Sequence, residues 1–273
     1  MKLLFWNINR KALVDEIKWL CDCYDVDIFV LAENVLSDIQ LLPILNKKTH
    51  RIFIVPPSRQ SSKISFFTRF HKFEPVYDDS WGVIRKITHP FGIELLLVAV
   101  HLPSKLRMDE REQAAIATRI ANEIDKQELK QGHTRTLVIG DFNMNPFETG
   151  MVSAEGFHAV MDKQIALKQS RTVQGMDRKY FYNPMWSRLG DDSIGSPGTY
   201  FHKSPTMIDP FWHTLDQVLL RPSLLASFKS DALVVIDQIA DKSLVERGKP
   251  ASQFSDHLPL MIKLDMSLLL GGH

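Results

Sequence analysis

The sequence has few of the features that mark specialised classes of protein. Only two of its 273 residues are cysteine, which excludes a disulfide framework. Its 33 lysine and arginine residues face 32 aspartate and glutamate residues, so the net charge of +1 excludes a basic coat that holds nucleic acid by charge alone. The hydrophobic runs are far shorter than the roughly 20 residues of a membrane span, and the apolar start is too short for a signal peptide. We therefore expect a soluble, cytoplasmic protein with no membrane span.

The composition is that of a chain that folds. With 44% hydrophobic and 24% charged residues it is neither disordered nor collagen-like. The length suffices for one large domain or two small ones. The sequence contains no internal repeat, low-complexity stretch or long linker.

Short apolar runs alternate with amphipathic segments along the whole chain. The runs predict buried strands, because they are short and rich in branched residues; they are Leu3–Trp6, Ile28–Leu31, Ile52–Val55, Leu95–Val100, Leu137–Ile139, Val218–Leu220 and Leu233–Ile236. Residues 258–264 alternate and predict a strand with one buried face. Helical spacing predicts one helix around residues 13–24 and a longer one over Met108–Lys130. Residues 145–199 lack periodicity and predict a long functional loop.

Polar residues stand where these strands end. Asn7 and Asn9 follow the first run, Glu33 follows the second, and His101 follows the fourth. Asp141 and Asn143 follow the fifth run, and Asp256-His257 precedes the last strand. Each residue alone is more often a turn former or a helix cap. Side chains that converge at one sheet edge, however, suit a hard divalent cation and a phosphate.

The order of these motifs resembles the endonuclease/exonuclease/phosphatase family over residues 3 to about 264. The motifs are Trp6-Asn7-Ile8-Asn9, Ala32-Glu33-Asn34, Val100-His101-Leu102, Gly140-Asp141-Phe142-Asn143, Leu215-Asp216-Gln217-Val218 and Ser255-Asp256-His257. The resemblance implies a single domain over residues 1–273 with a DNase I-like α/β fold. That fold is a four-layer α/β/β/α sandwich of two mixed β-sheets.

The resemblance also implies a metal-dependent hydrolase that acts on phosphodiester bonds. Glu33 would be the main ligand of Mg²⁺ or Mn²⁺, with Asn7 and Asp256 beside the metal. Many family members have Asp where this chain has Asn9, which removes one potential negative metal ligand. Alanine at position 32 also replaces a more usual glutamine.

The remaining residues of the set would perform the chemistry. Asp141 would orient or deprotonate the attacking water, and Asn143 would hold a phosphate oxygen. His257 would stabilise the charge that develops on the phosphate, while Asp216 fixes the tautomer of the His257 ring. His101 would contact the phosphate or serve the leaving group.

One stretch of the sequence bears on the choice of substrate. Residues 168–188 carry five basic residues against one acidic residue, with aromatic residues between them. This pattern suits nucleic acid, although an ordinary anchored loop is nearly as good an interpretation. Residues predicted to bind substrate are Asn9, Arg111, Arg178, Lys179 and Trp186. Arg111 is equally well explained as part of a solvated helix face. In the family, loops corresponding to residues 198–213 approach the site.

Three functions are compatible with these observations. A nuclease acting on DNA or RNA is favoured by the basic and aromatic stretch. A phosphatase or phosphodiesterase acting on a phosphoinositide, phospholipid or small nucleotide is the alternative. A binding module without catalysis is disfavoured by the nearly complete polar set. Nucleic acid is the expected partner, and the sequence does not indicate a protein partner.

Overall fold

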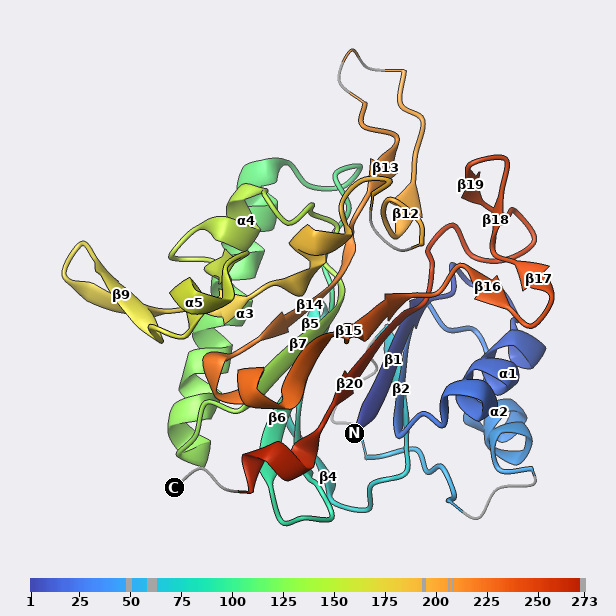
Figure 1. Ribbon diagram of the computed structural model, residues 1–273, viewed down its shortest axis with the longest axis horizontal. Helices are drawn as coiled ribbons and strands as arrows, with labels where there is room; N and C mark the ends of the chain where they lie inside the picture. Colours follow the sequence, from blue (N-terminus) through green and yellow to red (C-terminus); the bar gives the residue numbers. More distant parts are fainter. Residues whose placement is uncertain (48–50, 58–62, 193–194, 206, 208, 271–273) are drawn as a thin grey trace.

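The computed structural model describes residues 1–47, 51–57, 63–192, 195–205, 207 and 209–270. Two large β-sheets pack against each other (Figure 1). The first has five strands in the order β15-β20-β1-β2-β3. Their bounds are β15 Phe228–Val235, β20 Leu260–Leu264, β1 Lys2–Asn7, β2 Ile28–Ala32 and β3 Ile64–Thr68.

The second sheet has seven strands in the order β4-β5-β6-β7-β14-β11-β8. Their bounds are β4 Phe73–Asp78, β5 Gly82–Thr88, β6 Glu94–His101, β7 Thr136–Asp141, β14 Asp216–Leu220, β11 Phe181–Tyr182 and β8 Ala159–Val160. Both sheets are mixed, because β1 pairs with β2 in parallel and with β20 in antiparallel, as β7 does with β6 and β14.

Alternation along β6 shows how the layers are built. Leu95, Leu97 and Ala99 belong to the core between the sheets, whereas Leu96 and Val98 belong to a second core on the opposite face. All five are fully buried, since successive side chains of a strand point to opposite faces and both faces are covered. Because both faces are buried, the sequence of β6 is a continuous run of apolar residues.

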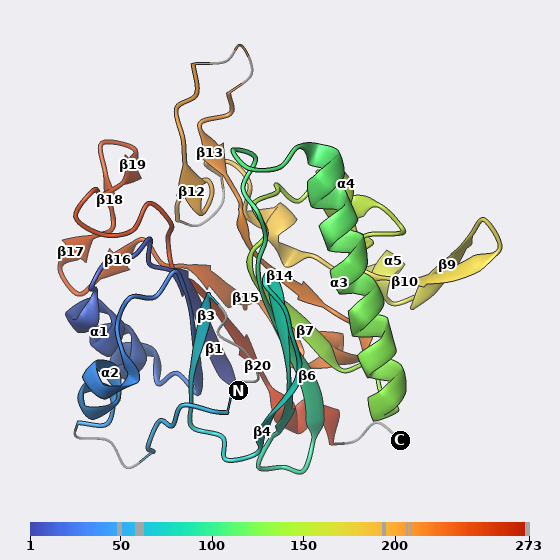
Figure 2. The same ribbon diagram turned by 180° about the vertical axis from the view of Figure 1, so that it is seen from behind.

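The second core lies under α3 (Glu110–Gln131), which covers the outer face of the seven-stranded sheet (Figure 2). This helix begins with a capping box, in which Asp109 and Glu112 each accept a backbone N–H of the other, and it ends at Gly132. Helices α1 (Val14–Tyr24) and α2 (Asp38–Leu45) flank the five-stranded sheet on the opposite side of the molecule. The four-layer α/β/β/α prediction is confirmed.

The remaining elements are short. The helical ones are α4 Thr149–Val152, α5 Lys163–Ala166, η1 Pro184–Arg188, η2 Pro222–Ser227 and η3 Met266–Leu269. Four hairpins are β9 Ser170–Val173 with β10 Met176–Lys179, β12 Tyr200–Phe201 with β13 Trp212–His213, β16 Gln238–Ile239 with β17 Lys242–Ser243, and β18 Val245–Glu246 with β19 Lys249–Pro250. The β9–β10 and β12–β13 segments project from the body (Figure 1). Within the described residues, no helix has the length and apolar character needed to cross a membrane.

Two sequence-based predictions of local structure are wrong. Ile52–Val55 forms no strand, and only an isolated bridge joins Ile54 to Thr68. Residues 145–199 are not one long loop, because they contain α4, α5, η1 and strands β8 to β11. These elements are two to five residues long, too short for a hydrophobic period to show in the sequence. The sequence analysis also missed α2, which begins with a capping box at Ser37 and Gln40 and contains Pro43.

Candidate active site

Two parallel strand pairs bring their carboxyl ends to the same edge of the sandwich. In the first sheet Asn7 of β1 lies opposite Ala32 of β2, and Glu33 follows directly. In the second sheet His101 of β6 lies opposite Asp141 of β7. Parallel strands end at the same edge, so four side chains that are distant in sequence become neighbours.

Antiparallel strands add two further groups at that edge. Asp216, the first residue of β14, lies opposite Asp141. His257 stands just before β20, which runs antiparallel to β1, and forms an isolated bridge with Tyr200. The site is therefore assembled from both sheets.

A cavity of about 520 Å³ opens at this edge. Seven of the residues singled out from the sequence line it: Asn7, Glu33, His101, Asp141, Asn143, Asp256 and His257. Asp216 does not line the cavity, because it lies behind the His257 ring. The structure thus brings together all eight residues to which the sequence assigned a catalytic or metal-binding role.

His257 and Asp216 form a buried pair. Nδ1 of His257 lies 2.8 Å from Oδ2 and 3.1 Å from Oδ1 of Asp216, and its Nε2 lies 3.9 Å from Oδ2 of Asp141. Burial alone would lower the pKa of His257, but the charges of Asp216 and Asp141 outweigh burial and raise the pKa to about 10. His257 is therefore an imidazolium at neutral pH, with Nε2–H available to an anion in the cavity.

Asp141 occupies the centre of the set. Its Oδ2 accepts a hydrogen bond from Nδ2 of Asn7 at 3.0 Å, and its Oδ1 accepts one from the backbone N–H of Asn143 at 2.9 Å. Burial raises the pKa of Asp141 to about 7, with Asp216 adding to the rise and His257 opposing it. A carboxylate with this pKa suits a general base near neutral pH.

Gly140, next to Asp141 in β7, allows this strand to lie close to β6. The residue has a φ of 151°, and a Cβ added there would lie 2.0 Å from the backbone oxygen of Val100. Any side chain would push β7 away from β6. The glycine thereby holds Asp141 next to His101.

Glu33 and His101 lie on the other side of Asp141. Nε2 of His101 is 3.5 Å from Oε1 of Glu33 and 3.8 Å from Oδ2 of Asp141. Burial of the imidazole outweighs the nearby Glu33 and lowers the pKa of His101 to about 4, so this ring is neutral. Nδ1 of His101 is buried without a hydrogen-bond partner among the described residues. Nε of Arg10 lies 3.2 Å from Oε2 of Glu33.

Comparison with known proteins identifies the family of this chain. The model of the endonuclease/exonuclease/phosphatase family matches residues 4–257. The chain belongs to this family. Membership in this family supports a metal-dependent phosphodiesterase in the general sense.

Solved structures with the same fold include three well-covered examples. Truncated Caenorhabditis elegans TDP2 is 14% identical, with a TM-score of 0.57 and 96% of each chain covered. The human Nocturnin catalytic domain with bound sulfate anion is 16% identical, with a TM-score of 0.55, and covers 96% of this chain and 93% of its own. D. rerio TDP2 complexed with single strand DNA product is 14% identical, with a TM-score of 0.55, and covers 97% of this chain and 98% of its own. A comparison with curated proteins gives no match.

The donors in this family member's cavity fit a divalent metal. The carboxylates of Glu33, Asp141 and Asp256 line one cavity, and oxygen ligands of this kind suit Mg²⁺ or Mn²⁺. Glu33 and Asp256 would hold the ion, with Asn7 beside them. Among the described residues, ligand atoms of Asp141, Asp216 and His257 also lie within 4.8 Å of one another. Within that group Nδ1 of His257 lies 2.8 Å from Oδ2 of Asp216, so the two side chains also pair with each other.

The sequence analysis missed several residues of the cavity wall. Lys63, Trp81, Lys105 and Arg107 line it, and Nζ of Lys63 lies 5.3 Å from the centre of the Trp81 ring. Lys105 and Arg107 come four and six residues after His101, a signal that could have been used. Lys63 and Trp81 belong to turns with no such signal. Tyr200, from the segment expected to approach the site, packs its ring 4.7 Å from the ring of His257.

Five residues predicted to bind substrate lie outside this lining. Nζ of Lys179 is 3.1 Å from Asp125 and 2.9 Å from Glu128, both on α3. A terminal nitrogen of Arg178 lies 4.0 Å from Oε1 of Glu155, and the centre of the Trp186 ring lies 6.3 Å from that of Phe147. Arg111 is exposed on the first turn of α3. Asn9 is also exposed, and its backbone N–H donates to Oδ1 of Asn7. The structure does not bring the basic stretch 168–188 to the cavity.

Proposed function

We propose that this protein is a divalent-metal-dependent nuclease that hydrolyses phosphodiester bonds of DNA or RNA by direct attack of water. The observation that carries the proposal is the wall of the cavity. In a chain of net charge +1, four cations line it: Arg10, Lys63, Lys105 and Arg107. Arg10 pairs with Glu33 and Lys105 with Glu148, so Lys63 and Arg107 are the cations of the lining that form no ion pair among the described residues. The rings of Trp81 and Tyr200 line it too. Cations contact backbone phosphates and rings stack on bases, so the two together favour nucleic acid over a simple phosphate ester.

The chemistry follows from the protonation states of the site. Asp141 removes a proton from the attacking water, because its pKa of about 7 places a base at neutral pH. His257 donates from Nε2 to a phosphate oxygen while Asp216 holds Nδ1. A divalent metal at Glu33 and Asp256 would neutralise charge on the phosphoryl oxygens. The oxygen–phosphorus bond to the leaving strand breaks as the bond to water forms, with no covalent enzyme intermediate.

The solved relatives support the substrate class. D. rerio TDP2 holds a single strand DNA product on the same fold. At 14% identity this likeness concerns the fold, so the choice of nucleic acid depends on the cavity wall described above. We also propose a cytoplasmic location, which suits two free cysteines.

A substrate panel tests the proposal. The purified protein is incubated with Mg²⁺, Mn²⁺ or EDTA and with single-stranded DNA, duplex DNA, RNA, inositol phosphates and a small chromogenic phosphodiester. His257→Ala, purified in the same way, controls for contaminating nucleases. We expect metal-dependent cleavage of at least one nucleic acid, lost in EDTA and in the variant. Turnover of inositol phosphates alone would replace the nuclease with the phosphatase alternative.

A further inference from the structure

A second groove of about 360 Å³ adjoins the catalytic cavity. The two share His202 and Asp256 in their walls, so they are adjacent. The groove lies between the β12–β13 arm and the β18–β19 hairpin, which stand side by side at the active-site edge (Figure 1).

The walls of this groove are positively charged. Lys203 comes from the arm, Lys249 from β19, and Lys11 from the loop after β1. The side chains of Lys203 and Lys249 are exposed, and no ion pair involves either of them within the described part of the chain. Lys11 donates to the backbone oxygens of Ser252 and Phe254, which fixes its position but leaves its charge. Asp256 is the acidic residue of the lining, and it also lines the catalytic cavity.

An aromatic side chain completes the groove. Phe201 is half-buried, with its ring 5.6 Å from that of Trp212 in an edge contact and 6.2 Å from that of Phe211 in a stacked one. These contacts hold the Phe201 ring in the groove wall. The Phe201 ring can stack on a base, and the ammonium groups of the lysines beside it can contact a backbone phosphate.

We propose that this groove binds the nucleotides on one side of the bond that is cleaved, while the cavity wall with Lys63, Lys105 and Arg107 binds those on the other side. The inference rests on the proposed function and deepens it. Cations line both the groove and the cavity, so both offer contacts to the phosphates of one strand. In this proposal a strand bound in both continues past the catalytic set in two directions. The enzyme therefore cleaves within a strand rather than only at its end.

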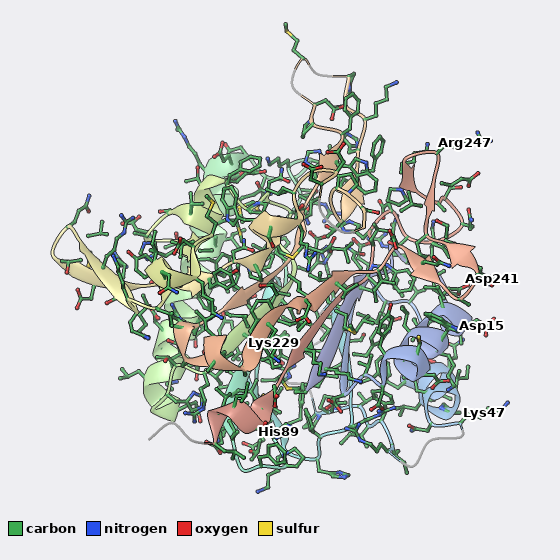
Figure 3. The ribbon with its side chains drawn as sticks, in the orientation of Figure 1. Asp15, Lys47, His89, Lys229, Asp241 and Arg247 are labelled. Carbon is green, nitrogen blue, oxygen red and sulfur yellow. The ribbon has the colours of Figure 1, made fainter. Side chains whose placement is uncertain are left out.

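The test combines a binding and a cleavage measurement on one variant pair. In Lys203→Glu/Lys249→Glu the groove loses two cations. The control Lys229→Glu/Lys263→Glu makes the same charge change on exposed lysines of β15 and β20. Lys229 lies well away from Arg247, which marks the tip of β18–β19 (Figure 3). Circular dichroism verifies that both variants are folded.

Binding is measured in EDTA with fluorescent single-stranded oligonucleotides of 4 and 12 nucleotides at several salt concentrations. We expect the groove variant to lose about tenfold in affinity for the 12-mer. Its salt slope should decrease by roughly 1.4, because each phosphate contact with a single strand contributes about 0.7. The control variant should retain both the affinity and the slope of the parent.

Cleavage is measured with metal on an internally labelled 12-mer and on a small chromogenic phosphodiester. We expect internal fragments from the parent, and a loss in the groove variant at least tenfold larger for the 12-mer than for the small diester. Equal losses on both substrates, or products that are solely mononucleotides released from an end, would overturn the inference while leaving the nuclease in place. A parent that hydrolyses nothing but binds the 12-mer through Lys203 and Lys249 would instead refute the proposed function and retain the groove.

Discussion

Nδ1 of His257 lies 2.8 Å from Oδ2 of Asp216, although the two residues are 41 positions apart, Asp216 in β14 and His257 in the segment before β20. The contact keeps the imidazole protonated and directs its Nε2–H away from Asp216. Both effects disappear if the carboxylate is neutralised, which makes the pair testable without disturbing the cavity wall.

Asp216→Asn should reduce kcat by roughly 10²-fold or more with little change in KM. Removing the anion lowers the pKa of His257, so the alkaline fall in rate should move from near pH 10 in the parent toward neutral pH. The double variant Asp216→Asn/His257→Ala should be little slower than His257→Ala alone. Multiplicative losses in the double variant would show that the two residues act independently.

Asp141→Asn should slow the chemical step by orders of magnitude while substrate binding persists, because one negative charge facing the phosphate has been removed. In the parent, burial places the pKa of Asp141 at about 7, so the carboxylate form and the rate should rise as the pH increases through 7. The rise should be absent in the variant. A single-turnover pH profile checks this, and parental turnover in Asp141→Asn would leave the residue as a turn former only.

Glu33→Gln should preserve the fold but weaken Mn²⁺ binding, measured by calorimetry, and reduce activity by orders of magnitude. Arg10→Gln is the matched control, because it removes the cation 3.2 Å from Glu33 while keeping the carboxylate. That variant should bind Mn²⁺ at least as well as the parent. Undiminished Mn²⁺ affinity in Glu33→Gln would place the metal elsewhere.

Gly140→Ala should lower the free energy of unfolding by roughly 2–4 kcal/mol, because the new methyl group would clash with the backbone of β6. Gly175→Ala at the tip of β9–β10 is the control. Its φ of 78° is strained for alanine, but no atom lies within 4 Å of the added Cβ, so about 1–2 kcal/mol is expected. Urea titrations measure both, and equal losses would mean that conformation rather than the clash governs Gly140.

The two thiols should differ in reactivity. Cys21 is fully buried and burial raises its pKa to about 12, whereas Cys23 is exposed. A disulfide reagent at pH 8 should therefore titrate one thiol in the native protein and two after denaturation. Cys23→Ser should leave none reactive in the native state. Two fast thiols in the native parent would mean that α1 opens readily.

Much of the catalytic set could be predicted because it follows a local rule. Asn7, His101 and Asp141 each end an apolar strand, and the end of a buried strand can be identified without knowing its neighbours. The surroundings could not be predicted in this way. Lys179 counted as a free charge in the sequence, yet α3, some 50 residues earlier, supplies the carboxylates that neutralise it. Ion pairs between residues that are distant in sequence cannot be predicted from a short stretch of sequence.

The same reason explains the missed cavity wall. Lys63 directly precedes β3 and Trp81 directly precedes β5, and only the packing of the two sheets brings both to the cavity that Asp141 lines. Short elements such as β8 and β11 form because tertiary contacts hold them, and their own sequence contains too few residues to show a pattern.

The hydrogen bond from Asn7 of β1 to Asp141 of β7 joins one sheet to the other, and the pair of His257 and Asp216 joins the segment before β20 to β14. The distance between groups on the two sheets, such as Asn7 and Asp141, therefore depends on the thickness of the hydrophobic core between the sheets. Leu97 and Ile139 are part of that core and do not line the cavity. We expect that removing one methylene from such a side chain would move Asp141, the proposed general base, relative to the opposite sheet, and reaction rates are sensitive to small displacements of this kind. Substitutions in the core between the sheets should therefore change the rate of the proposed reaction without any substitution in the active site.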